Sequence, residues 1–486
     1  MAPPAEARRL EGASLALLLL TAVMTGSAAA RSLTQAATSI TISGRLVLKD
    51  SHTQPVRWSL KAGADQVYRL PGQPTSASGS PIPPGAFLQL ACVLSPTDPK
   101  ACVSVSGATV NKAAAPTQST NVVIRSLTMV TSLVGSCSYA GANLGSVQTA
   151  MFGGPKPYST FFRNCSYGSM TFDTAGSKVI SVQLPCSAAI LGCDEDAVAS
   201  AALAKARQVL GTTAVAEFSH YAYVMPSGIA KCDWVGLAEL PGSQTWYSPT
   251  DQGIFNKGTY MQEFIHNFGL YHGWKNGVEY DDLSSAMGYG DSCPSAPELW
   301  RLGWAKPLAL LSSALLPAGA FRSYALPATA LAAVNHVKIQ PDWLGGGYTR
   351  NVYLALRLKR GGDMDLLPEF DRKVNVHAVN KGIDNSFLAS GDPQVSIIGT
   401  VGAGAVTDFK AYRLLVKAVA LSPDGTSMTV KLCRYAPPSP RPPPSPKPPS
   451  PKPPARVASP PPEDLLLEDW PPPPEEDWAW ELFGRK

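Results

Sequence analysis

The chain carries little net charge, and no apolar run in it is long enough to cross a membrane comfortably. Lysine and arginine number 41 against 36 acidic residues, which gives a formal net charge of +5 over 486 residues. A balance so near neutral argues against nucleic acid as the main partner. No stretch of about twenty apolar residues follows the first thirty residues. We therefore expect no transmembrane segment once a signal peptide has been removed.

Histidine is also scarce, with only six residues in the chain. Four of them are scattered without the spacing of metal ligands, and we assign them no site: His52, His220, His336 and His377. The other two lie within one short run of eleven residues, QEFIHNFGLYH. We locate the function in this run.

The run from Gln262 to His272 spaces its polar groups as a metal site requires. Positions i and i+4 of a helix share one face, so Gln262 and His266 would project side by side. Gly269 follows where a helix would end in a left-handed cap, and the reversed chain would bring His272 back to the same metal. Glu263 would then take a proton from a water that the metal activates. The pattern predicts metal-dependent hydrolysis.

Structural interpretations of the same residues remain open. The segment Thr259-Tyr260-Met261-Gln262 fits a capping box, in which the Gln262 amide turns back to the backbone of Thr259. His266 and His272 could be core histidines that are satisfied by hydrogen bonds. Glu263 could be a solvated helix residue.

The run resembles the extended zinc signature of metzincin peptidases, H-E-x-x-H-x-x-G-x-x-H, with Gln262 in place of the first histidine. Downstream, the segment SAMGY (residues 285–289) is similar to their methionine turn. The resemblance implies that Met287 supports the metal from below. It implies that Tyr289 is a displaceable ligand or an oxyanion stabiliser, unless it is an ordinary turn residue. The resemblance implies zinc as the metal. Because a neutral glutamine oxygen holds zinc less firmly than imidazole does, the identity of the metal stays open, and copper is the alternative.

Three further segments indicate one family within the metzincins: NCSYG (164–168), YAYVMPSG (221–228) and ELWRLGW (298–304). They are similar to the gametolysin family of volvocine green algae, secreted peptidases that digest hydroxyproline-rich cell-wall glycoproteins and accept glutamine at the first ligand position. The resemblance runs from about Leu127 to Pro307, and more loosely to Cys433. It implies a secreted metalloendopeptidase of the extracellular matrix or cell wall, with protein or glycoprotein substrates. A catalytically inactive matrix-binding protein with the same fold is the alternative.

Composition and periodicity divide the chain into five parts. We expect an α/β (α+β) metzincin-like catalytic domain flanked by an N-terminal β-rich unit and a C-terminal β-sandwich-like domain, with a disordered polyproline tail. The N-terminal unit is either a propeptide or an accessory binding module, and the signal peptide is either cleaved or kept as an anchor. The boundaries are 1–30 for the signal peptide, 31–120 for the β-rich unit, 121–310 for the peptidase domain, 311–435 for the C-terminal domain and 436–486 for the Pro-rich and acidic tail.

Within the peptidase domain, Val122–Val130 and Tyr221–Met225 are predicted strands, and Glu195–Leu210 is a predicted helix. By resemblance, Trp234–Leu240 is the edge strand that lies along the substrate, where a peptide can pair by main-chain hydrogen bonds.

Export implies that most of the nine cysteines form disulfides. Cys92 and Cys102 have two interpretations. They pair with each other, which we favour for so close a pair, or one of them is a propeptide thiol that occupies the metal's open position. Asn164 begins the only good N-glycosylation sequon, Asn164-Cys165-Ser166.

Overall fold

The computed structural model describes residues 38–51, 54–63, 66–114, 119–386 and 391–436, all within one compact unit, Met1–Ala436. The predicted signal peptide, the Pro-rich and acidic tail, and His52 lie outside the described residues. Among the described helices, none is long and apolar enough to span a membrane.

The peptidase domain is built on a twisted mixed sheet. Its strands follow the order β11-β12-β10-β7-β9, and all neighbours pair in parallel except β11, which is antiparallel to β12. The bounds are β7 Ser126–Val134, β9 Lys178–Pro185, β10 His220–Val224, β11 Gly236–Leu240 and β12 Gln244–Tyr247. A separate pair consists of β6 (Val122–Ile124) and β8 (Met170–Phe172). The predicted strand Val122–Val130 is thus two strands, interrupted at Arg125.

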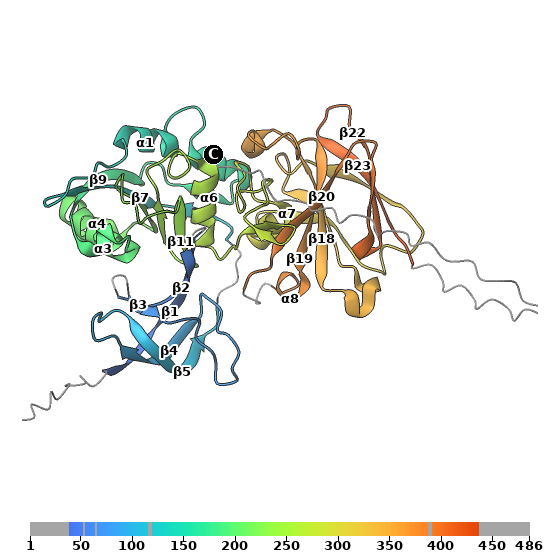
Figure 1. The fold of residues 1–486 in the computed structure, drawn as a ribbon. Coiled ribbons are helices and arrows are strands. Elements are labelled where there is room, and N and C mark those ends of the chain that lie inside the picture. Colours follow the sequence, from blue (N-terminus) through green and yellow to red (C-terminus); the bar gives the residue numbers. More distant parts are fainter. Residues whose placement is uncertain (1–37, 52–53, 64–65, 115–118, 387–390, 437–486) are drawn as a thin grey trace, which may run out of the picture. The chain divides into compact units, whose positions relative to one another are not determined.

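Helices cover both faces of this sheet, as predicted for an α/β layer (Figure 1). Alternate residues of β10 show the division, because Ala222 and Val224 join one core and Tyr223 joins the other. One face carries α1 (Leu144–Phe152), α2 (Tyr158–Cys165) and α6 (Lys257–His266), and the other carries α3 (Ala188–Leu191), α4 (Glu195–Leu210) and α5 (Thr212–Ala216). The bounds predicted for α4 are those observed.

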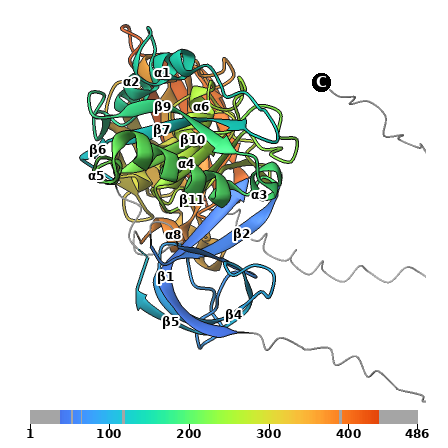
Figure 2. The same cartoon turned by 90° about the vertical axis from the view of Figure 1, so that its left-hand side faces the viewer.

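The N-terminal part of the described chain is a set of antiparallel strands. Its bounds are β1 Ser39–Ser51, β2 Gln54–Lys61, β3 Val67–Leu70, β4 Phe87–Leu94 and β5 Cys102–Lys112. The first half of β1 pairs with β4, and its end pairs with β11 through Leu48↔Leu240, Lys49↔Glu239 and Asp50↔Ala238. β1 therefore belongs both to the N-terminal unit and to the sheet of the peptidase domain (Figure 2). The strand predicted over Trp234–Leu240 contains β11, and in the intact chain β1 occupies the side of β11 that is not paired with β12. Pairing of this strand with a substrate stays a prediction.

The C-terminal part contains two sheets that share one apolar core. Seven strands follow the order β14-β13-β20-β19-β18-β17-β15, and four follow β16-β23-β22-β21. The bounds are β13 Gly273–Lys275, β14 Val278–Glu279, β15 Lys306–Leu311, β16 Arg322–Pro327, β17 Val334–Ile339, β18 Arg350–Arg357, β19 Lys373–Asn380, β20 Val395–Gly402, β21 Val406–Phe409, β22 Leu414–Leu421 and β23 Ser427–Arg434. Two short helices complete this region, α7 (Ala296–Arg301) and α8 (Lys381–Asp384). Because β13 begins directly after His272, the larger sheet anchors the end of the predicted metal motif.

Eight of the nine cysteines form disulfides: Cys92–Cys102, Cys137–Cys186, Cys165–Cys293 and Cys193–Cys232. Cys433 is the free cysteine, and it is buried. The Cys92–Cys102 pairing is the one we favoured. It contradicts the alternative of a propeptide thiol at the metal, since neither sulfur is available.

Candidate metal centre

Helix α6 carries the first part of the predicted site. Asn256 caps it, and the Asn256 side-chain oxygen accepts a 2.8 Å hydrogen bond from the backbone N–H of Thr259. Thr259 therefore lies inside the first turn and is not the cap residue. The capping-box interpretation of Gln262 is wrong, because that residue lies well inside the helix.

Gln262 is buried and faces the methionine turn. The amide of Gln262 has one orientation in which both its oxygen and its nitrogen have suitable hydrogen-bond partners. In this orientation Nε2–H donates to the carbonyl oxygens of Ala286 at 3.2 Å and Gly288 at 3.1 Å. These bonds hold the amide nitrogen and turn the Gln262 oxygen away from the two carbonyls. The oxygen is the atom that a metal would use.

His266 and His272 are brought together by the turn that follows α6. Gly269 has a φ of 85°, the left-handed conformation predicted for it, and its N–H bonds to the carbonyl of His266 at 2.8 Å. His266 Nδ1–H donates to the Leu270 carbonyl at 2.6 Å. A carbonyl can only accept, so Nδ1 carries the proton and a neutral ring keeps its lone pair on Nε2. The two imidazole ring centres lie 4.6 Å apart.

His272 is oriented by a residue that the sequence did not single out. Its Nδ1 lies 2.8 Å from Glu279 Oε1, which accepts the hydrogen bond, so that a neutral ring again has its lone pair on Nε2. Tyr280 packs against the same ring, with 3.9 Å between ring centres. The hairpin of β13 and β14 positions Glu279, and only its seven-residue distance from His272 could have suggested the pairing.

The three predicted ligands fit a divalent metal. Both imidazoles have Nδ1 held by an acceptor, and the Gln262 amide nitrogen is held by turn carbonyls. Two ring nitrogens and one amide oxygen leave room for further ligands, as a catalytic zinc site requires. Asp50 of β1 is also close. Candidate ligand atoms of Asp50, His272 and Glu279 lie within 4.8 Å of one another.

Glu263 is buried beside the start of β11. Gly236 makes space for it, because a Cβ at that position would lie 2.7 Å from Glu263 Cδ. Burial raises the pKa of Glu263 well above its ordinary value, and the nearby Asp50 carboxylate raises it further. Burial, followed by the charge of Glu279, raises the pKa of Asp50 to about 6. The carboxyl groups of Glu263, Asp50 and Glu279 therefore lie close enough to raise one another's pKa. A cation bound among them would be stabilised.

The segment SAMGY forms a tight turn around the buried Met287, whose carbonyl accepts a 2.7 Å hydrogen bond from Gly273 N–H. The sequence assigned His377 no role, yet its Nε2 lies 3.0 Å from Oδ2 of Asp282, just before the turn. Both residues are buried. The chain returns from β19 to make this contact, so local spacing gave no signal for it.

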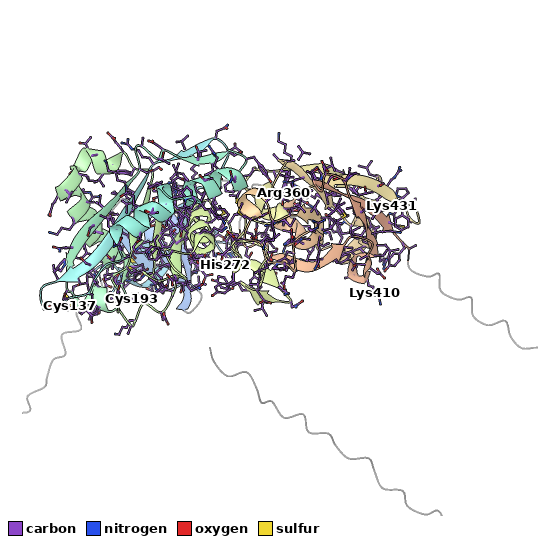
Figure 3. The ribbon with its side chains drawn as sticks, turned by 90° about the horizontal axis from the view of Figure 1, so that it is seen from above. Cys137, Cys193, His272, Arg360, Lys410 and Lys431 are labelled. Atoms are coloured by element: carbon purple, nitrogen blue, oxygen red, sulfur yellow. A yellow bond between two sulfur atoms is a disulfide. The ribbon has the colours of Figure 1, made fainter. Side chains whose placement is uncertain are left out.

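Two predicted residues are exposed. Tyr289 is 57% exposed, and its ring centre lies 6.1 Å from that of Tyr280, which packs against His272. Figure 3 labels His272 among the side chains of the described residues. Its role as a ligand or oxyanion stabiliser remains a prediction. Asn164 is exposed on α2, and its glycosylation also remains a prediction.

Comparison with known proteins agrees with this geometry. A family model described as gametolysin peptidase M11 matches residues 125–412, more than half of the chain. Autolysin from Chlamydomonas reinhardtii is 29% identical over 197 residues, and the match covers 32% of this chain and 30% of the autolysin. The chain thus spans less than a third of the length of that relative. The match to the family model includes α6, His272 and the methionine turn, and on this evidence the chain belongs to the gametolysin M11 family of metallopeptidases.

Proposed function

We propose that the protein is a secreted metalloendopeptidase that hydrolyses peptide bonds of extracellular matrix or cell-wall glycoproteins. The observation that carries the proposal is the pairing of His266 and His272, whose rings lie 4.6 Å apart with both Nδ1 atoms held by acceptors. Two histidines oriented in this way present lone pairs to one ion. Membership of the M11 family supports the reaction class.

In the proposed reaction, Gln262, His266 and His272 would hold the metal, with zinc favoured over copper. When bound, the metal polarises the scissile carbonyl and lowers the pKa of water. Glu263 takes the proton from the attacking water, and its carboxylate lies at the start of β11, beside the strand that would hold the substrate. Met287 is buried in the turn whose Ala286 and Gly288 carbonyls hold the amide of Gln262, and in this proposal it supports the site.

The N-terminal unit serves in this proposal as an inhibitory propeptide. β1 pairs antiparallel with β11, as an extended peptide substrate would. Asp50, the last residue of that pairing, places Oδ2 3.9 Å from His272 Nδ1. A substrate cannot pair with the same part of β11 until β1 leaves it.

The second candidate is an inactive matrix-binding protein in which Gln262 is a lost ligand. The space that Gly236 leaves for the Glu263 carboxylate favours the enzyme. A protein that only binds has no need to keep a buried acid beside the ligands, because burial of a carboxylate is costly.

The test is metal content measured together with proteolysis, in protein from which the N-terminal unit has been cut. We expect about one equivalent of zinc or copper per chain, with cleavage of a protein substrate that a chelator stops and added metal restores. Folded protein that binds no metal and cleaves nothing would favour the binding protein.

A further inference from the structure

Lys49 of β1 inserts its side chain into the peptidase domain. Only 2% of that side chain is exposed. Its Nζ lies 3.2 Å from Glu195 Oε1 and 2.6 Å from Asp196 Oδ1, and 4.8 Å from the ring centre of Trp246. We call Glu195, Asp196 and Trp246 the acidic pocket. Burial alone would lower the pKa of Lys49, but the carboxylates of the pocket raise it above its ordinary value, so the amine stays charged.

The acidic pocket is built from peptidase residues alone. Asp194 caps α4 by accepting a 3.0 Å hydrogen bond from Ala197 N–H, which places Glu195 and Asp196 in the first helical turn. Negative charge is stabilised there by the helix dipole. Trp246 of β12 donates Nε1–H to the Glu195 carbonyl at 3.0 Å. The walls of the pocket are therefore fixed without β1. In the intact chain its carboxylates pair with Lys49 and, at Glu195 Oε2, with Arg57 of β2 at 2.8 Å, so both cations belong to the N-terminal unit. Without that unit the buried Glu195 carboxylate needs another cation.

The residues of β1 that reach the acidic pocket and the metal site are neighbours in sequence, Lys49 and Asp50. Successive side chains of a strand point to opposite faces. Asp50 accordingly reaches towards His272, while Lys49 enters the acidic pocket. A peptide that replaced β1 on β11 in the same register would bring one side chain to the metal site and the next to the pocket.

We propose that the acidic pocket is a substrate subsite that selects a lysine side chain, and that Lys49 fills it in the intact chain. The inference rests on the proposed peptidase function. The two carboxylates accept hydrogen bonds from a compact ammonium group, which has three donors, and the indole face attracts the same charge. Substrates would thus carry a lysine close to the scissile bond.

The experiment compares peptides of one sequence in which lysine or glutamine stands at each position in turn. The enzyme is the full chain cut at a protease site inserted between Ala113 and Ala114, with both pieces kept in solution. A competing strand lowers kcat/KM for every peptide by the same factor, so the ratio of two peptides reports the subsite alone. We expect lysine to be preferred at one position by about tenfold or more.

Variants show whether the preference comes from the pocket. Asp196→Asn should bring the lysine-to-glutamine ratio towards one. Glu217→Gln should leave the ratio unchanged, because Glu217 is an exposed acid of the same domain that pairs with Arg125 at 2.8 Å. Cleavage of both peptide sets with equal kcat/KM at all positions would overturn the proposal and leave the pocket as an anchor for β1. That result differs from failure of the proposed function, in which no peptide is cleaved and no metal is bound.

Discussion

Glu279 Oε1 accepts a 2.8 Å hydrogen bond from His272 Nδ1–H across the hairpin of β13 and β14. The third ligand of the proposed site is thus oriented by a residue outside the zinc signature. A carboxylate in this position fixes the tautomer of the histidine and increases its basicity.

Glu279→Ala should weaken metal binding by about 10-fold to 100-fold, because His272 loses the acceptor that orients it. Competition with a fluorescent chelator measures the affinity. Glu279→Gln is the matched control, since the amide oxygen still accepts from Nδ1–H, and it should lose less. Equal affinity in the alanine variant and the parent would show that the hydrogen bond does not support a metal ligand.

Gln262→His should bind zinc more tightly than the parent, because imidazole is a better zinc ligand than a neutral amide oxygen. The same competition assay gives the change. Weaker binding would mean that Gln262 is not a ligand, or that the site is shaped for another metal. Gln262→Leu, which can neither bind metal nor donate to Ala286 and Gly288, provides the lower reference.

Gly236→Ala tests the position of the proposed base. The added methyl would lie 2.7 Å from Glu263 Cδ, so the carboxylate must move while the three ligands keep their places. We expect kcat/KM to fall about 100-fold with metal content unchanged. Gly346→Ala is the control, since nothing lies within 4 Å of a Cβ there. Full activity in Gly236→Ala would rule out the observed placement of Glu263.

His220 should make the protein sensitive to acid. Burial lowers the pKa of His220 to about 4, from 6.5 when unfolded. Between these values the unfolded chain binds a proton that the folded chain does not, so stability falls as pH drops from 6.5 to 4, by up to roughly 3 kcal/mol. His220→Phe keeps the ring packing against Phe264 and Phe268 and should lose less stability over that range in denaturant titrations. An unchanged pH dependence would remove His220 as its source.

The sequence pattern predicted the helices and turns that are determined by residues adjacent in the chain. The spacing of Gln262 and His266 and the glycine at 269 were sufficient to predict the motif helix, its end and the return of His272, because each depends on a few adjacent residues. The predicted bounds of α4 were correct for the same reason, since Asp194 and Gly211 mark its ends. The capping box failed because Asn256 was an equally good cap one turn earlier.

Contacts between distant segments could not be predicted in this way. Asp50 and His377 reach the site region from β1 and β19, and their positions depend on strand pairing that no local periodicity specifies. The pairing of β1 with β11 could not be predicted for the same reason, because the two strands are far apart in sequence. The residues that reach the site from distant strands could therefore be identified only from the structure.

The most direct test of the central claim is Glu263→Gln in the chain freed of its N-terminal unit, with metal content and cleavage measured in the same sample. The substitution keeps the shape of the side chain and removes its ability to accept a proton. We predict that the metal stays at about one equivalent while kcat falls by about 10²-fold to 10⁴-fold. Cleavage at the parental rate with metal bound would contradict the account, because Glu263 would then not be the base.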